Sequence, residues 1–322
     1  MRRFALLAAT AAFFAAWCPG ASAQAFPGKL VRIIVGFVPG GVADIIARDF
    51  AIRMQRTWGQ SVIVENRPGA NGVVATQALA KSPADGYTLM LTISSHITNG
   101  LMVGNLGYDP IKDIVPVGVI ASAPLVLVAH PSFPADNIKA LIAMARKRPG
   151  SISYATPGTG SIQHLSIELL NYLSGTKMVQ VPYRGGAPAV SDVLGGQLPL
   201  TITSIAQVFQ FIQTKKLKPL GVTSLKRVEV LPAVATFAES GVGGYESELW
   251  FGLIAPAGTP MQVVQKINAE IIRILGVPEV RERLVAEGTR PIGNTPEQFA
   301  ELLVKDQEKW TRIFRETGIK PE

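Results

Sequence analysis

The chain has 322 residues, of which 48% are hydrophobic and 17% charged, with one cysteine and a formal net charge of +8. A chain of this length can bury a large core and is more typical of two domains than of one. The basic residues are scattered and few aromatic residues lie between them, so the composition gives no support for nucleic-acid binding and allows a mild preference for anionic small molecules.

The first 23 residues have the pattern of a secretory signal peptide. Two arginines precede an apolar run over residues 4–17, and Ala21-Ser22-Ala23 is a small-residue cleavage site, so we expect cleavage after Ala23. The apolar run is too short to span a membrane. Cys18 would suit a lipoprotein, but Trp17 stands where a lipid-attachment motif has a small residue. Removing the two arginines from the 31 basic side chains leaves 29 against 23 acidic ones, so the mature chain, residues 24–322, carries +6 and has no cysteine.

Short apolar strands alternate with helices in the first part of the mature chain. A buried strand over residues 31–37 is expected to run through the turn Pro39-Gly40-Gly41 into a helix that opens near Asp44 and ends at residue 58. Further strands are expected at 61–65 and 87–93. The predicted buried face of the first helix consists of Ile45, Ile46, Phe50 and Met54. This alternation favours a parallel sheet with helices on both faces.

Two longer apolar stretches, residues 115–129 and 248–255, are predicted to be crossover strands. Between them the alternation of strands and helices resumes, with strands expected at 152–155, 178–181, 198–203 and 217–223. After the second crossing the chain is helical, and Thr295-Pro296-Glu297-Gln298 is a capping box that opens the last helix. We therefore expect an α/β protein of two lobes, with lobe 1 at 24–123 and 249–322 and lobe 2 at 124–248. Two such lobes can close on a ligand.

Glycine turns at the carboxyl ends of the predicted strands are the candidate binding elements. Each precedes a helix whose first N–H groups lack partners within the helix and attract negative charge. Ligands of open α/β sheets sit at this edge. The candidate turns are Gly40-Gly41 to Asp44, Gly158 to Ser161, Gly185-Gly186-Ala187 and, more weakly, Gly69 to Gly72. Their distribution over both lobes indicates a small anion held between them.

Several side chains near these turns have two possible roles. Ser161 could cap its helix, contact a ligand, or do both. Asp44 is evenly balanced between a helix cap and an acceptor for a ligand N–H or O–H group, or for a bridging water. Arg184 is a candidate cationic contact or a solvated loop residue. Thr156 and Thr159 add hydroxyl groups that suit a carboxylate.

The motifs typical of enzymes and metal proteins are missing from the sequence. It has no HExxH, no GxSxG and no spaced set of His, Asp and Glu, so no catalytic residue, metal or cofactor is expected. Of the three histidines, only His164, in the first turn of a helix, lies near enough to a glycine turn to help bind an anion.

Seven stretches of the chain carry a family resemblance. They are VRIIVGFVPGGVADIIAR, VIVENRPGANG, ADGYTLML, YDPIKDIVPVGVI, SYATPGTGSIQHLSIELL, VPYRGGAPAVSDVLGGQ and WFGLIAPAGTP, in this order over nearly the whole mature chain. With them the sequence resembles the solute-binding proteins of tripartite tricarboxylate transporters, called Bug or TctC proteins. The resemblance implies a two-lobed periplasmic binding protein of type II-like fold, each lobe a mainly parallel sheet flanked by helices. It further implies a periplasmic monomer that delivers a carboxylated small molecule to a two-component membrane permease without chemistry. A ligand-dependent partner of a membrane sensor is the alternative.

The resemblance also implies a set of ligand-binding residues. In lobe 1 they are Phe37, Gly40, Val42, Ala43 and Asp44; in lobe 2 they are Thr156, Thr159, Gly160, Ser161 and His164, with Gly186 and Ala187 nearby. Ser94, Arg184 and Ser204 complete the predicted set. Two departures make the distal pocket less polar than in many members: Val42 replaces Ser or Thr, and Thr203-Ser204-Ile205-Ala206 replaces a loop with Asp and Asn. We therefore expect a ligand with one carboxylate held as usual and a more apolar, aromatic or longer body than a short dicarboxylate.

Overall fold

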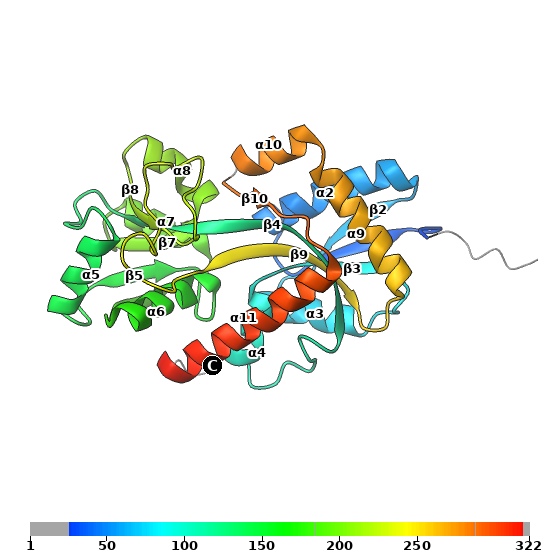
Figure 1. Cartoon of the computed structure of the whole chain (residues 1–322), viewed down its shortest axis with the longest axis horizontal. Helices are drawn as coiled ribbons and strands as arrows, with labels where there is room; N and C mark the ends of the chain where they lie inside the picture. Colours follow the sequence, from blue (N-terminus) through cyan, green and yellow to red (C-terminus); the bar gives the residue numbers. More distant parts are fainter. Residues whose placement is uncertain (1–25, 184, 287, 318–322) are drawn as a thin grey trace, which may run out of the picture.

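A computed structural model describes residues 26–183, 185–286 and 288–317 of the chain. Two α/β lobes lie next to each other and are joined by long strands that run through both (Figure 1). The predicted signal peptide and the candidate ligand residue Arg184 fall outside the described residues.

Lobe 1 is built on three parallel strands with helices packed against them. The central strand β1 pairs with β2 on one side and with β3 on the other. β1 is almost entirely buried, as a strand in the middle of a parallel sheet covered on both faces must be. The elements are β1 (Val31–Val35), α2 (Val42–Trp58), β2 (Val62–Asn66), η1 (Ala70–Gly72), α3 (Val73–Ala80) and β3 (Thr88–Ile93).

Lobe 2 repeats this arrangement with its own parallel strands in the order β7-β5-β6. A fourth strand, β8, lies off this path and pairs with the crossing strand β4. The elements are α5 (Ile138–Lys147), β5 (Ser153–Thr156), α6 (Ile162–Ser174), β6 (Val179–Pro182), α7 (Gly186–Leu194), β7 (Leu200–Ser204), α8 (Ile205–Gln213) and β8 (Lys218–Val222).

The two predicted crossover strands exist and are antiparallel to each other. They are β4 (Ile114–Ala129) and β9 (Glu248–Pro256), and β9 pairs β3 while β4 pairs β7 and β8. β4 pairs with β9 as far as Pro124 and with β7 from Leu125 onward. One uninterrupted strand therefore belongs to the sheets of both lobes, and a proline stands where its partner changes.

The chain beyond β9 forms three helices, α9 (Met261–Leu275), α10 (Pro278–Ala286) and α11 (Pro296–Thr317), and the two-residue strand β10 (Arg290–Pro291) on β4. The capping box that opens α11 is confirmed, because Thr295 N–H donates to Gln298 Oε1 at 3.0 Å and Gln298 N–H donates to Thr295 Oγ1 at 3.3 Å. α11 runs past the crossing strands and contacts α4 (Ser95–Met102) in one lobe and α6 in the other (Figure 1). None of the described helices is long and apolar enough to cross a membrane.

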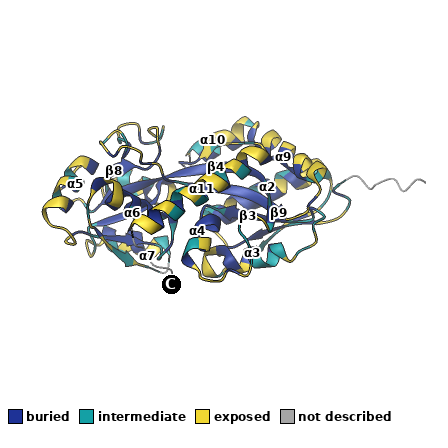
Figure 2. Cartoon of the chain, turned by 60° about the horizontal axis from the view of Figure 1, so that its bottom comes forward, coloured by how far each residue is buried: buried dark blue, intermediate teal, exposed yellow. Residues whose placement is uncertain are grey.

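One helix was not predicted from the sequence, and one residue was assigned to the wrong face of a helix. The segment directly after β3 forms α4 (Ser95–Met102), which buries most of its length. Ile45 is not on the buried face of α2: it is 46% exposed, whereas Ile46, Phe50 and Met54 are buried. Ile45 is five residues from Phe50, which is out of step with a helical stripe. The buried strands and the exposed outer faces of the helices are seen in Figure 2.

Candidate functional site

The first glycine turn is held in place by the carboxylate of Asp44. Its Oδ2 accepts the backbone N–H of Gly40 at 2.9 Å and the Nε–H of Arg48 at 2.9 Å, and its Oδ1 accepts Asn66 Nδ2–H at 2.8 Å. Asn66 also donates to the carbonyl of Phe37 at 3.0 Å. The end of β2, the turn and the first turn of α2 are thus tied together around one carboxylate.

The contact of Asp44 with the N–H of Gly40 is close to the first of its two predicted roles, that of a helix cap. The N-cap of α2 is Gly41, and Asp44 in the third helical position reaches back over it, as the acidic residue of a capping box does. Asp44 is only 2% exposed, and its oxygens already accept three hydrogen bonds. Burial alone would raise the pKa of this carboxyl, but the hydrogen bonds from Arg48, Gly40 and Asn66 outweigh it and hold the pKa below its ordinary value. Asp44 therefore shapes the loop before its own helix, and its contact with a ligand, direct or through water, stays a prediction.

The other ligand residues predicted in lobe 1 differ in how far they are buried. Ala43 is buried in the core, so its side chain is unavailable to a ligand. Phe37 is half-buried and packs on the second glycine turn, where a Cβ on Gly72 would lie 3.8 Å from its ring. Val42 is half-buried, and Gly40 is exposed with a positive φ of 84°. Val42 and the turn before it are the part of this set that faces solvent.

Two glycine turns of lobe 2 lie against each other, as the sequence predicts. Gly185 N–H donates to the carbonyl of Pro157 at 3.1 Å, which places the turn before α7 next to the turn before α6. Ser161 is the N-cap of α6: its Oγ accepts His164 N–H at 3.2 Å and donates to the carbonyl of Gly158 at 2.7 Å. The capping role of Ser161 is confirmed. The N-termini of α6 and α7 are thereby brought to one edge of the lobe.

The buried ring of His164 holds the turn before α6 in place. It is 6% exposed, and its Nδ1 accepts the backbone N–H of Gly160 at 3.2 Å, while Nε2 lies 4.0 Å from Glu168 Oε1. Burial lowers the pKa of His164 to about 4, so the ring is neutral at physiological pH. His164 therefore positions the Gly160 turn and contributes no positive charge to an anion.

Thr156 and Thr159, both predicted to contact the ligand, differ in how far their side chains are buried. Thr156 is fully buried, and its Oγ1 accepts Gln180 Nε2–H at 2.7 Å, so it supports the end of β5. Thr159 is half-buried in the turn itself. Gly186 is half-buried and Ala187 exposed at the start of α7.

Two contacts between glycine and an aliphatic side chain join the lobes. A Cβ on Gly160 of lobe 2 would lie 2.9 Å from Cγ of Met102 in α4 of lobe 1. A Cβ on Gly288, which precedes β10, would lie 2.9 Å from Cβ of Ile205 at the start of α8. Both glycines have positive φ, so the backbone of each approaches the opposite lobe in a conformation that favours glycine.

A cavity of about 250 Å³ lies between the lobes. One wall comes from the start of α2, the other from the start of α8, and the floor comes from the crossing strands and the segment before β10. Its walls are predominantly apolar and, among the described residues, include no charged side chain. The lining residues are Val42, Ile45, Ala123, Ser204, Ile205, Ala206, Phe251, Gly288 and Thr289. Of the predicted site residues, only Val42 and Ser204 line it.

Gln207 is a polar residue beside the start of α7 that the sequence analysis did not single out. It is exposed on the first turn of α8, its Oε1 accepts the hydroxyl of Thr203, and its amide lies against Gly186, where a Cβ would be 2.8 Å from Oε1. Because Oε1 is occupied by Thr203, the Nε2 donors remain at the N-terminus of α7. No periodicity in the sequence pointed to Gln207, because Thr203 belongs to β7, Gln207 to α8 and Gly186 to α7.

Ser94, the remaining predicted residue, is buried at the end of β3. Its Oγ has no hydrogen-bond partner among the described residues. The N–H of Ile97 bonds to the backbone carbonyl of Ser94 at 3.3 Å, so Ser94 begins α4 without a side-chain cap. The structure does not place it on the cavity wall.

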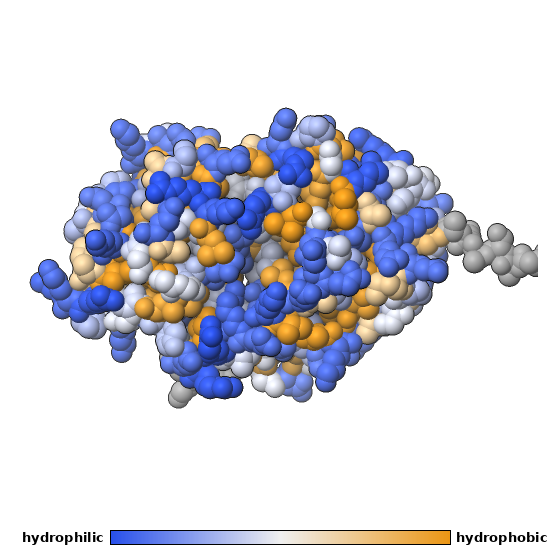
Figure 3. Space-filling view, viewed as in Figure 1, coloured by the Kyte–Doolittle hydropathy of each residue, from blue (hydrophilic) through white to orange (hydrophobic). Residues whose placement is uncertain are grey.

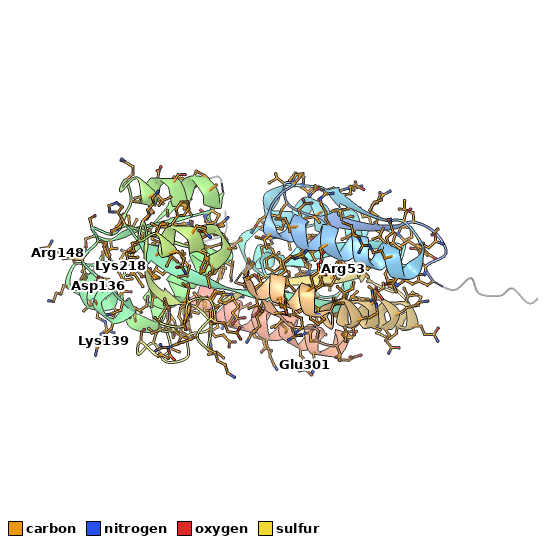
Figure 4. The ribbon with its side chains drawn as sticks, turned by 90° about the horizontal axis from the view of Figure 1, so that it is seen from above. Arg53, Asp136, Lys139, Arg148, Lys218 and Glu301 are labelled. Atoms are coloured by element: carbon orange, nitrogen blue, oxygen red, sulfur yellow. The ribbon has the colours of Figure 1, made fainter. Side chains whose placement is uncertain are left out.

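One group of charged side chains lies at the far end of lobe 2. Figure 4 shows Asp136, Lys139 and Arg148 at the end of lobe 2 farthest from lobe 1, where Lys218 pairs with Asp136 at 2.6 Å. On the face drawn in Figure 3, apolar atoms lie on both sides of the seam between the lobes. In the part of the chain that the structure describes, no group of three or more His, Cys, Asp or Glu residues could hold a metal ion.

Residues 46–319 match the model of the tripartite tricarboxylate transporter family receptor, TctC. The chain belongs to this family. It is 38% identical to the protein BugT of Bordetella pertussis over 93% of this chain and 92% of that protein. It is 37% identical to a protein encoded between tcbD and tcbE in Pseudomonas sp. strain P51, over 91% and 88%.

Solved structures of TctC and Bug proteins have the same fold. A protein of R. palustris solved with adipate superposes with a TM-score of 0.83 at 36% identity, over 92% of this chain and 100% of that one. The periplasmic binding protein BugD gives 0.80 at 34%, over 92% and 100%. MatC of Rhodopseudomonas palustris with bound malate gives 0.78 at 30%, over 89% and 99%. The predicted family and the α/β fold of a periplasmic binding protein are confirmed, and the TctC family is one of solute-binding receptors.

Proposed function

We propose that this TctC protein captures a carboxylated small molecule between its lobes in the periplasm and delivers it to a two-component membrane permease. The proposal is supported by two helix N-termini, those of α6 and α7, that meet at one edge of lobe 2, and by an apolar cavity between the lobes. Backbone N–H groups at a helix start are suited to a carboxylate. No chemistry is proposed, and the ligand leaves unchanged.

The similar proteins support the ligand class. One was solved with adipate and another with malate, and both ligands are carboxylates. By analogy, the seat of one ligand carboxylate in this chain is proposed at Thr159 to Ser161 together with Gly186 and Ala187. Arg184, which precedes this second turn, is proposed to add a cationic contact.

The lobe boundaries and the location in the cell belong to the same proposal. We place lobe 1 at 24–123 and 249–322 and lobe 2 at 124–248, which is supported by the change of β4 from β9 to β7 after Pro124. We further propose that residues 1–23 are removed after Ala23 and that the mature protein acts as a monomer. Mass spectrometry of the protein isolated from periplasm tests the cleavage, because a mature chain that begins at Gln24 is expected.

Calorimetry and thermal shift with a panel of aliphatic and aromatic carboxylates test the binding role. A ligand that binds only the folded state raises the melting temperature with concentration, by about 2.7 kcal/mol of stabilisation at a hundredfold excess over Kd. Native mass spectrometry of the purified protein would detect a trapped ligand directly. A panel in which no organic acid binds would contradict the proposal.

Uptake measurements test the delivery step. Loss of a permease encoded nearby is expected to abolish uptake of the ligand while leaving binding by the purified protein intact. Uptake that persists without any such permease would favour instead a ligand-dependent partner of a membrane sensor.

A further inference from the structure

We infer that the last helix, α11, opposes closing of the lobes, and that its contact with α6 through Glu316 and Tyr172 lowers ligand affinity from outside the cavity. The inference rests on the proposed function in one respect, that the ligand is bound between lobes that close on it. It requires neither a particular carboxylate nor a particular seat for that carboxylate.

The helix α11 and the interlobe cavity lie on opposite faces of the crossing strand β9. Trp250 Nε1–H donates to Asp306 of α11 at 2.8 Å, and a Cβ on Gly252 would lie 2.5 Å from the ring of Phe299, also in α11. Phe251, which stands between these two strand residues, lines the cavity. Because successive side chains of a strand point to opposite faces, α11 covers the back of the strand that forms the cavity floor.

The two ends of α11 belong to different lobes. Near its start, Phe299 is fully buried and packs edge-on against Trp250 with ring centroids 5.2 Å apart, and the helix contacts α4 and α9 of lobe 1. Its other end runs alongside lobe 2 and contacts α6 (Figure 1). Ile313 and Phe314 are buried there, so the last turns are packed. One helix therefore spans both lobes beside the strands on which they hinge.

Tyr172 of α6 and Glu316 of α11 join the two helices. The hydroxyl of Tyr172 hydrogen-bonds with the Glu316 carboxylate, which raises the pKa of the phenol, while Arg312, one turn earlier in α11, acts in the opposite direction. Both Tyr172 and Glu316 are exposed, so either side chain can be truncated without opening the core. Neither residue lines the interlobe cavity.

The lobes also touch on the cavity side of the crossing strands. Gly288 and Ile205 both line the cavity, and a Cβ on Gly288 would lie 2.9 Å from Cβ of Ile205. A rotation about the crossing strands that narrows the cavity must separate the lobes on the other side, where α11 meets α6. The contact between Tyr172 and Glu316 is therefore stretched on closing, and it stabilises the more open arrangement.

Such a contact changes ligand affinity without touching the ligand. When a ligand binds only between closed lobes, its apparent affinity is reduced by the fraction of the protein that is closed. Removing a contact made only in the open arrangement raises that fraction, so binding becomes tighter. A contact that merely stabilises the fold would not have this effect, because its loss does not favour the closed arrangement.

The first test measures the distance between the lobes and needs no ligand. Residues 24–322 contain no cysteine, so spin labels can be placed on Ile52→Cys in α2 and Gln210→Cys in α8, both exposed and on helices whose starts form opposite walls of the cavity. Pulsed EPR is expected to show a larger population of short distances when Tyr172→Ala or Glu316→Ala is added. An unchanged distribution, or a shift to longer distances, would overturn the inference.

Leu173→Ala is the matched control for this measurement. Leu173 is the next residue of α6 and is also partly exposed, but it lies beside Lys139 and Ile142 of α5, on the side of α6 away from Tyr172. Its truncation is expected to leave the distances unchanged. A shift in Leu173→Ala as large as that in Tyr172→Ala would show that any change on α6 moves the lobes, which would contradict a specific role of α11.

Calorimetry with adipate, the ligand in the structure of a similar protein, measures the consequence for binding. Tyr172→Ala and Glu316→Ala are each expected to bind adipate about threefold more tightly than the wild type, and Leu173→Ala with unchanged affinity. Tyr172→Phe, which loses only the hydroxyl, should show part of the gain. Affinities of Tyr172→Ala and Glu316→Ala equal to or weaker than that of the wild type would count against the inference.

Joining the same two positions should have the opposite effect. In a variant with Tyr172→Cys and Glu316→Cys, a short bismaleimide linker holds α11 against α6. Adipate is expected to bind at least about tenfold more weakly than to the same variant with both thiols blocked by N-ethylmaleimide. A linked protein with unchanged affinity would show that closing does not stretch this contact.

Failure of this inference and failure of the proposed function give different results. If adipate binds and neither the EPR distances nor the affinity responds to Tyr172→Ala, the inference fails and the proposed function stands. If no carboxylate binds, the proposed function fails, and the EPR distances alone decide whether α11 opposes closing.

Discussion

The carboxylate of Asp44 accepts the backbone N–H of Gly40 at 2.9 Å, so a side chain in the first turn of α2 fixes the loop that precedes its own helix. The same carboxylate accepts from Arg48 and Asn66, which belong to the helix and to the neighbouring strand β2. The glycine turn is therefore pre-formed, and the loop needs little further ordering when a ligand arrives.

Replacing Asp44 should destabilise the folded protein. In Asp44→Ala the N–H of Gly40 and the amide of Asn66 lose their acceptor, and we expect a loss of about 2–4 kcal/mol in the free energy of unfolding. Urea denaturation with an unchanged m-value measures it. Asp44→Asn keeps one acceptor oxygen and should lose about half as much. Equal midpoints for wild type and Asp44→Ala would contradict the structural role.

Two buried histidines should make stability depend on pH between about 6.5 and 4. Burial lowers the pKa of both His96 and His164 to about 4, from the ordinary value of 6.5. In this window the unfolded chain binds protons that the folded chain does not, so the free energy of unfolding falls as pH falls, on the order of 2 kcal/mol per histidine between pH 7 and pH 5. The nearby Glu168 carboxyl, whose pKa burial raises, acts in the opposite direction and offsets part of this loss.

Urea titrations at pH 7 and pH 5 check this dependence. His96 is the cleaner probe, because its Nε2–H donates to the carbonyl of Pro110 at 2.7 Å and the ring is fully buried. His96→Gln can keep an N–H donor for the carbonyl of Pro110 but does not titrate. The slope of the free energy of unfolding against pH should therefore fall by the contribution of about one proton. A variant whose slope equals that of the wild type would show that His96 does not titrate as its burial requires.

The contact between Gly160 and Met102 should couple the lobes energetically. Gly160→Ala forces an L-residue into a φ of 75° and brings its Cβ to 2.9 Å from Met102 Cγ, so we expect a loss of about 1–3 kcal/mol. Met102→Ala in the same chain relieves the clash but not the backbone strain. A double-mutant cycle read by urea denaturation should therefore show partial rescue, of about 0.5–1 kcal/mol; strictly additive effects would rule out the contact.

The last helix is anchored to a crossing strand by one buried hydrogen bond. Trp250 Nε1–H donates to Asp306 Oδ2 at 2.8 Å, and Asp306 also pairs with Lys309 at 2.9 Å. Asp306→Ala should lower the free energy of unfolding by about 2–3 kcal/mol and change the tryptophan emission, because the indole N–H loses its acceptor. Lys309→Ala is the control, with less than about 1 kcal/mol expected for a partly exposed ion pair.

Helical and strand periodicity predicted most of the architecture. Alternating strands and helices with glycine turns determine a parallel sheet locally, and both crossover strands stood out as long apolar stretches. The helix α4 was missed because its buried residues include Ser95, His96, Thr98 and Asn99, whose polarity hides a buried segment from a hydrophobic pattern. Ile45 was assigned to the buried face of α2 because the helical spacing was applied loosely. A strict spacing of four residues before Phe50 selects Ile46 and excludes Ile45.

The site was less predictable than the fold. Glycine turns indicate where a ligand can sit, but which side chains turn outward depends on packing between segments distant in the chain. Asp44 and His164 follow glycine turns in the sequence, which made them candidate ligand residues, and the structure adds that each accepts a backbone N–H of the turn before it. The cavity floor at Ala123 and Phe251 comes from apolar strands that carry no functional signature in sequence.

The shared strand β4 also determines how the protein unfolds. Residues 125–129 of β4 lie between β7 and β8 of lobe 2 and pair with both, while residues 114–124 pair with β9. A fragment of lobe 2 that began after residue 129 would present two unpaired strand edges to other chains and would tend to aggregate. Thermal melting of the intact protein should accordingly be a single cooperative transition, with neither half surviving the other.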